Sequence, residues 1–209
     1  MTGSIDALLR ENALALGMSL SETQSAALLG YAELVVKWNR HMNLVGSGSP
    51  DELIRNHLTD CLSAIAYIDG THIVDVGSGA GLPGIVVAIM RPERQITLVE
   101  SNQKKARFLR QVAIELPLSN VSVVASRIEN WHPSVLPNCI VCRAYSALDK
   151  FLADTHHLRE AGCSLVAMKG AEQHIEDAGL EGFNGTIRTQ PLTVPGWDHR
   201  HLVIFQCHG

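Results

Sequence analysis

The fold of this chain is decided by residues 72–84, which read His72-Ile73-Val74-Asp75-Val76-Gly77-Ser78-Gly79-Ala80-Gly81-Leu82-Pro83-Gly84. A run rich in β-branched residues leads into a glycine-rich turn, and a proline then opens an apolar helical segment. Glycine lacks a Cβ, so the backbone can turn tightly there and approach a ligand closely. Proline suits the first helical turn, where its missing N–H is not needed. The order strand, loop, helix predicts the nucleotide-binding crevice of an open α/β sheet.

The ligand depends on how the glycines are interpreted. Residues 79–84 satisfy the dinucleotide pattern G-x-G-x-x-G literally, so a dinucleotide is one alternative. Asp75 and the pair Gly77-Ser78 precede that match, however, so the strand does not run directly into its first glycine. The pattern Asp-x-Gly-x-Gly-x-Gly instead resembles motif I of the S-adenosylmethionine (SAM)-dependent methyltransferases. A glycine-rich turn without a ligand is disfavoured, because excess glycine weakens folded structure.

Length and composition indicate one substantial globular core. The chain has 209 residues, of which 46 % are hydrophobic and 18 % are charged, as in folded domains. We expect no membrane span, because no apolar run approaches ~20 residues, and no signal peptide. The five cysteines are odd in number and scattered, which suits a reducing compartment. We therefore expect a cytoplasmic protein.

The formal net charge is −4, which is mild evidence against a nucleic-acid substrate, since a basic balance is expected for one. Local patches set the field at a site, so the net charge does not exclude RNA. If RNA is bound, the charge predicts that few phosphates are engaged and that affinity depends only shallowly on salt.

Hydrophobic periodicity divides the chain into two regions. Residues 1–66 are expected to form helices, with capping boxes that begin at Ser21 and Ser49, and to pack on the remainder. Residues 67–209 are expected to form a domain of alternating strands and helices, with a mostly parallel sheet and an antiparallel C-terminal hairpin. Within it we predict strands at 72–76, 95–100, 121–125, 139–142 and 164–168, helices at 104–116 and 146–162, and a hairpin over 186–207.

Several residues near the predicted carboxyl ends of the strands can bind a nucleotide-like ligand. Glu100 ends the second strand and can accept hydrogen bonds from ribose hydroxyls, unless it is only a solvated acid. Ile128 can pack on an adenine ring with Glu129 beside it, unless the segment is an ordinary loop. Asp75 orients either the glycine loop alone or the ammonium group of the ligand.

Cations follow the later strands at the same edge. A guanidinium at Arg143 or an ammonium at Lys169 can meet a carboxylate or a phosphate, although each also fits an ordinary surface charge. Lys104 and Lys105 lead a basic cluster on one predicted helix, which faces either RNA phosphates or only solvent.

Two polar segments, 38–44 and 55–60, interrupt the apolar N-terminal pattern. Their amide and imidazole groups, including Asn39 and His57, fit either a binding rim or helix capping. Arg200 in the last hairpin is a further candidate contact.

Cysteine and histidine do not predict a metal site. Cys139 and Cys142 lie in one predicted strand, so their side chains face opposite sides and cannot share a metal. His156 and His157 are adjacent and splay apart on a helix, so we expect no zinc. We also find no Ser/His/Asp hydrolase elbow.

Motifs beyond the glycine loop match one family in order across nearly the whole chain. With the loop, they make the sequence resemble the bacterial small-subunit ribosomal RNA methyltransferase G family, also known as glucose-inhibited division protein B. The departures are small: Cys61 stands where the family often has serine, and Tyr145 where it often has phenylalanine. The matching motifs are Trp38-Asn39, Met42-Asn43-Leu44, His57-Leu58 with Asp60, Glu100-Ser101, Lys104-Lys105, Phe108-Leu109-Arg110, Ser126-Arg127-Ile128-Glu129, Arg143-Ala144, Lys169-Gly170 and Arg200-His201-Leu202.

The resemblance implies a Rossmann-like class I SAM-dependent methyltransferase that methylates N7 of guanine 527 in 16S rRNA. It implies 16S rRNA and the 30S subunit as partners, no metal, and a monomer. We expect Arg143 and Lys169 to be catalytic, by anchoring the cofactor carboxylate or an RNA phosphate. The expected cofactor contacts are Asp75, Gly77, Gly79, Gly81, Leu82, Glu100, Ile128, Glu129 and Arg143. The expected RNA contacts are Asn39, His57, Lys104, Lys105 and Arg200.

The chemistry fits the absence of an obvious general base. Guanine N7 already presents a lone pair, so the enzyme has to align the reacting atoms, and the base has to be unpaired or flipped outward. Two other interpretations remain open. A methyltransferase for a protein or small molecule would transfer methyl groups without RNA. A dinucleotide-dependent oxidoreductase or a non-catalytic nucleotide-binding module would bind nicotinamide and not SAM.

Overall fold

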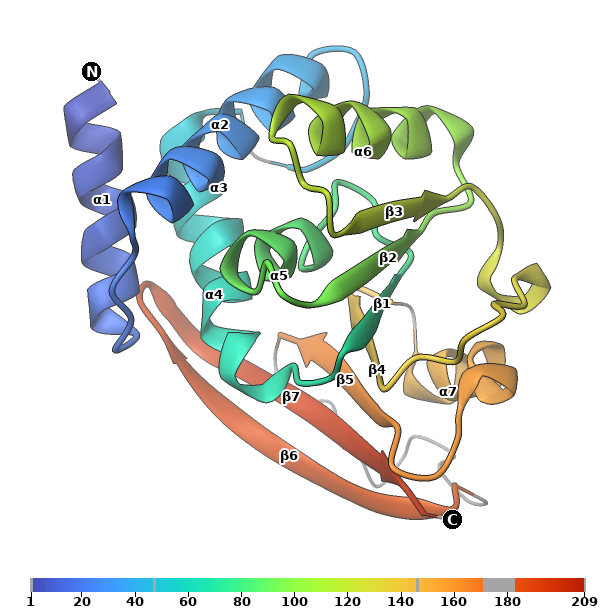
Figure 1. The fold of residues 1–209 in the computed structure, drawn as a ribbon. Helices are drawn as coiled ribbons and strands as arrows, with labels where there is room; N and C mark the ends of the chain where they lie inside the picture. Colours follow the sequence, from blue (N-terminus) through green and yellow to red (C-terminus); the bar gives the residue numbers. More distant parts are fainter. Residues whose placement is uncertain (1, 47, 146, 171–182, 209) are drawn as a thin grey trace.

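A sheet lies at the centre of the computed structural model, which describes residues 2–46, 48–145, 147–170 and 183–208 (Figure 1). Its strands are β1 (His72–Val76), β2 (Gln95–Val99), β3 (Val121–Val124), β4 (Cys139–Arg143), β5 (Ser164–Lys169), β6 (Gly185–Val194) and β7 (Trp197–Cys207). They are arranged in the order β3-β2-β1-β4-β5-β7-β6. The first five run parallel, and β7 runs antiparallel to both β5 and β6. The predicted parallel sheet with an antiparallel C-terminal hairpin is confirmed.

The chain order reverses between β1 and β4, which are neighbours in the sheet. Crossovers leave a crevice at such a switch point, outside the carboxyl ends of the strands, and ligands bind there. The register of β5 and β7 pairs Lys169 with His201, so the residues that begin β7 lie at this same edge.

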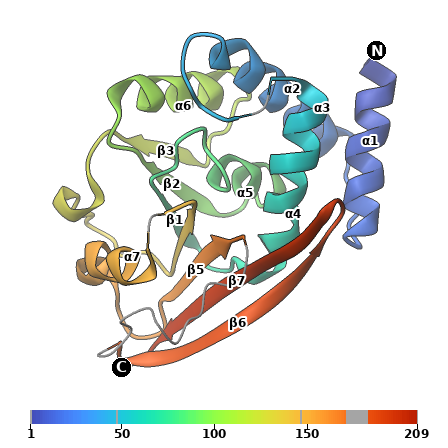
Figure 2. The same cartoon turned by 180° about the vertical axis from the view of Figure 1, so that it is seen from behind.

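Helices cover both faces of the sheet (Figures 1 and 2). One face carries α1 (Thr2–Ala15), α2 (Glu22–Asn39), α3 (Pro50–Leu53), α4 (Thr59–Ala64), α5 (Gly84–Met90) and α6 (Gln103–Glu115), and the other carries α7 (Leu148–Asp154). Short turns are the π-helical η1 (Ile54–Leu58) and the 3-10 segments η2 (Ile65–Tyr67), η3 (Ile128–Asn130) and η4 (His156–Leu158). No helix of the described residues is long and apolar enough to cross a membrane.

Local chemistry explains where the helices begin. Ser21 and Ser49 both form the predicted capping boxes, each with the residue three positions later. Such a box satisfies backbone N–H groups that the first helical turn leaves without partners. Asn102 caps α6 by accepting hydrogen bonds from the N–H groups of Lys104 and Lys105.

One apolar core joins the N-terminal helices to the sheet. Leu9 of α1, Leu28 of α2 and Leu62 of α4 belong to the same buried cluster as Ile73 of β1 and Ile85 of α5. Burial of each such side chain contributes about 1.5–3 kcal/mol, so the helices and the sheet stabilise each other. The division of the chain into residues 1–66 and 67–209 stays a prediction.

A second core fills the opposite face of the sheet. Cys139 belongs to the first cluster and Cys142 to the second, as the alternation of side chains along a strand requires. The prediction that the two thiols face opposite sides is confirmed.

Two helices differ from the prediction. The helix expected over 146–162 is shorter: α7 ends at Asp154, where the Thr155 hydroxyl bonds back to the Phe151 carbonyl oxygen at 2.7 Å, and η4 follows. Ser146, the first residue of the predicted helix, lies outside the described residues. The helix that starts at Pro50 widens into η1, because both the N–H and the hydroxyl of Thr59 bond to the carbonyl oxygen of Ile54, five residues back.

Candidate functional site

The glycine loop is fixed across the ends of β1 and β2. The N–H groups of Gly77 and Ser78 both donate to the carbonyl oxygen of Val99, at 2.9 and 3.2 Å. The Ser78 hydroxyl donates to the carbonyl oxygen of Asp75 at 2.8 Å. The loop therefore lies at the predicted crevice, with its backbone turned by positive φ angles at Gly77, Gly79 and Gly81.

Asp75 lies beneath this loop and is fully buried. Its Oδ2 accepts a hydrogen bond from the Gly84 N–H at 2.9 Å, which ties the start of α5 to β1. Its Oδ1 is buried and has no hydrogen-bond partner within the described residues. Burial raises the pKa of Asp75 to about 7, because a carboxylate loses its hydration there.

Glu100 uses its carboxylate to join the loop to the next helix. Its Oε2 accepts from the Gly79 N–H at 2.8 Å and its Oε1 from the Asn102 N–H at 2.7 Å. The side chain predicted to bind ribose thus braces two backbone segments of the crevice in this structure.

The far side of the loop packs against the helices. A Cβ at Gly81 would lie 2.6 Å from Ile85 and 2.9 Å from Leu109, so no larger residue fits. The Tyr31 hydroxyl of α2 donates to the Ala80 carbonyl oxygen at 2.8 Å. Leu82 is buried in the same core, so its backbone, and not its side chain, is near the crevice.

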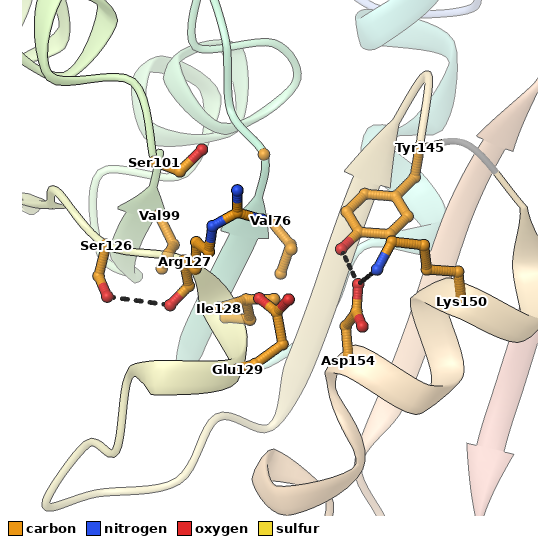
Figure 3. A pocket seen from close by; sticks show the side chains of 11 residues that line it. Val76, Val99, Ser101, Ser126, Arg127, Ile128, Glu129, Tyr145, Lys150 and Asp154 are labelled. Carbon is orange, nitrogen blue, oxygen red and sulfur yellow. Dashed lines mark hydrogen bonds and ion pairs between the residues drawn. The ribbon is translucent and has the colours of Figure 1, made fainter.

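A pocket of about 120 Å³ opens beside the loop (Figure 3). It brings together three predicted cofactor contacts, Gly77, Ile128 and Glu129, with apolar walls from Val76 and Val99. An apolar wall beside a carboxylate acceptor is the environment that an adenine ring with its ribose requires. We call this space the cofactor pocket.

The cofactor pocket is also lined by side chains that the sequence analysis did not single out. Tyr145, Lys150 and Asp154 face Arg127 and Glu129 across it (Figure 3). The Tyr145 hydroxyl and the Lys150 ammonium both donate to Asp154 Oδ2, at 2.6 and 2.7 Å. The spacing of four residues between the lysine and the aspartate was a signal for a helical ion pair, but it does not say that the pair faces a pocket.

Four polar side chains meet at the end of β4. Arg143 donates to His57 Nδ1 at 3.0 Å and lies 3.5 Å from Asp60 Oδ2. Arg200 of β7 donates to both oxygens of Asp60, with the Nε contact at 2.7 Å. We call Arg143, His57, Asp60 and Arg200 the arginine cluster. It brings together one predicted catalytic residue and two predicted RNA contacts around an aspartate to which no role was given.

Burial and charge set the protonation of this cluster. The Asp60 side chain is only 1 % exposed, and two guanidinium groups compensate the loss of its hydration. Burial, together with the charge of Arg143, lowers the pKa of His57 to about 4. His57 is therefore neutral at pH 7, as an imidazole nitrogen that accepts from Arg143 must be.

Lys169 lies at the end of β5, next to this cluster but not in contact with it. Its ammonium donates to the carbonyl oxygen of Tyr145 at 3.2 Å. The contact holds the backbone that follows β4, so Lys169 shapes the rim between the cofactor pocket and the arginine cluster.

The remaining predicted RNA contacts differ in position. The Asn39 amide closes the loop after α2, since its oxygen accepts from Leu44 N and Val45 N and its nitrogen donates to the Val45 carbonyl. Lys104 is exposed and Lys105 half-buried on the first turn of α6. Nothing in these contacts brings either lysine to the arginine cluster.

A second cavity, of about 340 Å³, lies beside η1 and is lined by Gly46, Glu52, Asn56, His57 and Trp197. We call it the η1 cavity. The Trp197 indole N–H points to the Arg55 carbonyl oxygen at 3.5 Å, and the guanidinium of Arg200 lies 5.2 Å from its ring centre. Within the described ranges, no three His, Cys, Asp or Glu side chains form a group that could hold a metal ion.

Comparison with known sequences gives one consistent result. The chain matches the family model described as rRNA small subunit methyltransferase G over residues 24–203. The ribosomal RNA small subunit methyltransferase G of Pseudomonas syringae pv. tomato is 44 % identical over 192 residues, 91 % of each chain. The protein of the same name from Nitrosococcus oceani is 43 % identical over 198 residues, 94 % of this chain and 92 % of that one.

Solved structures share the fold at much lower identity. Magnesium protoporphyrin IX methyltransferase from Synechocystis PCC 6803 with bound SAH gives a TM-score of 0.62 at 12 % identity, covering 85 % of this chain and 99 % of that one. A SAM-dependent methyltransferase from Aquifex aeolicus gives 0.56 at 16 % identity, covering 76 % and 93 %. The expected Rossmann-like methyltransferase fold is confirmed.

Proposed function

Because the chain belongs to the rRNA small subunit methyltransferase G family, we propose that it methylates N7 of guanine 527 in 16S rRNA with SAM as methyl donor. The observation that supports this most is the match over 91 % of both chains to a relative of that name. The cofactor pocket at the switch point of the sheet agrees with it.

The residues around the cofactor pocket fit SAM. Ile128 offers an apolar face for the adenine, and Glu129 offers acceptors for its polar groups. The unpartnered Oδ1 of Asp75 is the natural acceptor for an ammonium group near the glycine loop. When bound, SAM supplies an electrophilic methyl group on a positively charged sulfur.

The side chains of this chain have to align the base and exclude water. Guanine N7 carries a lone pair in its neutral form, so no residue has to remove a proton from it. Alignment alone can lower such a barrier by several kcal/mol. Arg143 meets both requirements of an anchor, because its guanidinium is fixed by His57 and Asp60 and can still bind a carboxylate or a phosphate. Lys169 positions the rim of the pocket and Arg200 holds Asp60.

Partners and location follow from the substrate. The proposed partner is the 30S subunit or its 16S rRNA, in the cytoplasm, with no metal. We propose that the protein acts as a monomer, since the large exposed apolar side chains of the described residues, Leu14, Ile114, Val135 and Trp197, lie in four separate parts of the chain.

The reaction is tested with 30S subunits from cells that lack the enzyme. The protein is added with methyl-labelled SAM, and the rRNA is digested to nucleosides. We expect label only in N7-methylguanosine at one position. Absence of label on both 30S subunits and naked 16S rRNA, with SAM binding intact, would contradict the substrate; label on a protein in RNA-free assays would replace it.

Arg143 gives the role-specific test of the same proposal. Arg143→Ala should lower the rate of methyl transfer by at least ~100-fold, as loss of a preorganised charged donor does. Its circular dichroism spectrum should stay that of the wild type, because Asp60 keeps Arg200. Retained activity would remove Arg143 from the mechanism.

A further inference from the structure

The η1 cavity borders the arginine cluster through His57. His57 lines the cavity and accepts a hydrogen bond from Arg143. Two residues beyond Arg143, Tyr145 lines the cofactor pocket. His57, Arg143 and Tyr145 therefore connect the two spaces through the end of β4.

We propose that the η1 cavity receives the target guanine, with Glu52 accepting hydrogen bonds from its N1–H and N2 amino group and Trp197 stacking on its ring. The inference rests on the proposed function and deepens it, since it assigns residues that select the base. The volume of about 340 Å³ leaves room for a base and part of its ribose.

Glu52 is already held in place for such a contact. Its Oε2 accepts from Gly48 N at 2.9 Å and from Ser49 N at 3.3 Å, as the acid of the capping box. Its Oε1 makes no hydrogen bond to any described residue. A carboxylate repels RNA phosphates, but the two lone pairs of Oε1 can accept two adjacent N–H donors. Guanine presents such a pair, N1–H beside the N2 amino group, on its pairing edge.

The same contact orients the reacting atom. In guanine, N7 lies on the ring edge opposite the N2 amino group. A base held at its pairing edge by Glu52 therefore directs N7 away from that residue. His57 lines the cavity and contacts Arg143 at the strand end that leads to the cofactor pocket, so in the proposed pose the N7 lone pair is directed toward the methyl donor.

Trp197 supplies a surface on which a base can stack. Its side chain is 40 % exposed although it is large and apolar. The hydrogen bond to Arg55 and the contact with Arg200 keep it beside η1. Stacking on an aromatic side chain is the usual way in which proteins bind an unpaired RNA base.

The direction in which one substitution changes activity on 30S subunits tests the role of Glu52. Glu52→Gln preserves the capping box, in which either residue serves, and removes one negative charge. If Glu52 merely lies near RNA, the variant should bind 30S subunits more tightly. We expect instead that kcat/KM for 30S subunits falls roughly tenfold, because a lost bidentate base contact has about that effect. Affinity for SAM should not change.

Asp51→Asn is the matched control. Asp51 is the neighbouring exposed acid on the same helical turn and does not line the cavity, so the charge change is identical. We expect its kcat/KM to equal or slightly exceed that of the wild type. An unchanged or raised kcat/KM for Glu52→Gln would overturn the proposal, and so would an equal loss in both variants.

A binding measurement separates this inference from the proposed function. Titration with guanosine 5′-monophosphate should quench the tryptophan fluorescence of the wild type. Inosine 5′-monophosphate should quench it more weakly, because it lacks the N2 amino group. The Trp197→Phe variant should show no quenching with either nucleotide. Equal quenching by the two nucleotides, or quenching that persists in Trp197→Phe, would overturn the inference. This titration needs no methyl transfer. Failure of the 30S assay alone would therefore contradict the proposed rRNA substrate and leave the proposed guanine contact in the η1 cavity standing.

Discussion

At the residue scale, the arginine cluster shows how a buried charge can organise a site. Asp60 is 1 % exposed and is shared by Arg143 and Arg200. The sequence placed His57 and Arg143 among the candidates because their residue types carry chemistry. It assigned no role to Asp60, because an aspartate in a helix gives no sign of its partners. Likewise Glu100 was identified as a site residue, but its hydrogen bonds to backbone N–H groups depend on loop geometry.

Asp60→Asn should destabilise the protein strongly. It leaves two guanidinium groups without their shared carboxylate, and breaking a buried ion pair costs about 3–5 kcal/mol. Urea denaturation should therefore show a free energy of unfolding lower by about 3 kcal/mol. The exposed acid Glu93 is the control, and Glu93→Gln should change stability by less than about 0.5 kcal/mol. Equal effects of the two variants would mean that Asp60 is solvated.

Asp75 predicts a pH dependence of stability. Its pKa is about 7 in the folded protein, above the ordinary value of 3.8. The folded state therefore holds this proton more tightly than the unfolded state, and its stabilising effect is lost as the pH rises from about 4 to 7. Asp75→Asn should remove this component, so the difference in free energy of unfolding between the two proteins should vary across that window. A constant difference would contradict the raised pKa.

At the element scale, the sequence predicted each of the five parallel strands within about one residue, because β-branched runs bounded by turn residues are a local signal. The predicted hairpin over 186–207 consists of β6 and of β7, which begins at Trp197. The π-helical η1 was not predicted, since it depends on how Thr59 bonds to Ile54 and not on periodicity. Because η1 places His57 in the arginine cluster, an element that local sequence patterns failed to predict belongs to the candidate site.

The glycine loop permits a test of packing against backbone strain. Gly81→Ala should destabilise the protein by about 1–3 kcal/mol more than Gly17→Ala. Both glycines have positive φ, +96° and +76°, but only at Gly81 would a Cβ clash with neighbours. Thermal unfolding of the two variants checks this, and affinity for SAM should fall only for Gly81→Ala. Equal shifts in Tm would show that the core around Ile85 relaxes.

At the scale of the whole molecule, the fold class followed from alternating strands and helices, which is a pattern along the entire chain. The core was harder to predict, because residues from both predicted regions share one cluster. Assembly of the site was beyond reach, since Asp60 and Arg200 are 140 residues apart and no local signal pairs them.

The distribution of charge leads to a prediction for RNA binding. Lys104 is exposed on the first turn of α6, close to Ser101 of the cofactor pocket. Lys104→Gln should reduce the slope of log affinity for 30S subunits against log salt concentration by roughly one, as loss of a phosphate contact does. Arg91 follows the last residue of α5, at the edge formed by the amino ends of the parallel strands. Arg91→Gln should therefore leave the slope unchanged. A slope unaffected by Lys104→Gln would place that lysine in solvent.

The bond between Asp60 and Arg200 also has a consequence for biosynthesis. These residues are 140 positions apart, and a ribosome adds ~5–20 residues per second. Asp60 is therefore made on the order of ten seconds before the strand that carries its partner. Until β7 leaves the exit tunnel and pairs with β5, the nascent chain can fold its glycine loop, but Asp60 lacks Arg200 and the arginine cluster is incomplete. An enzyme that modifies ribosomes thus becomes competent only at the end of its own translation.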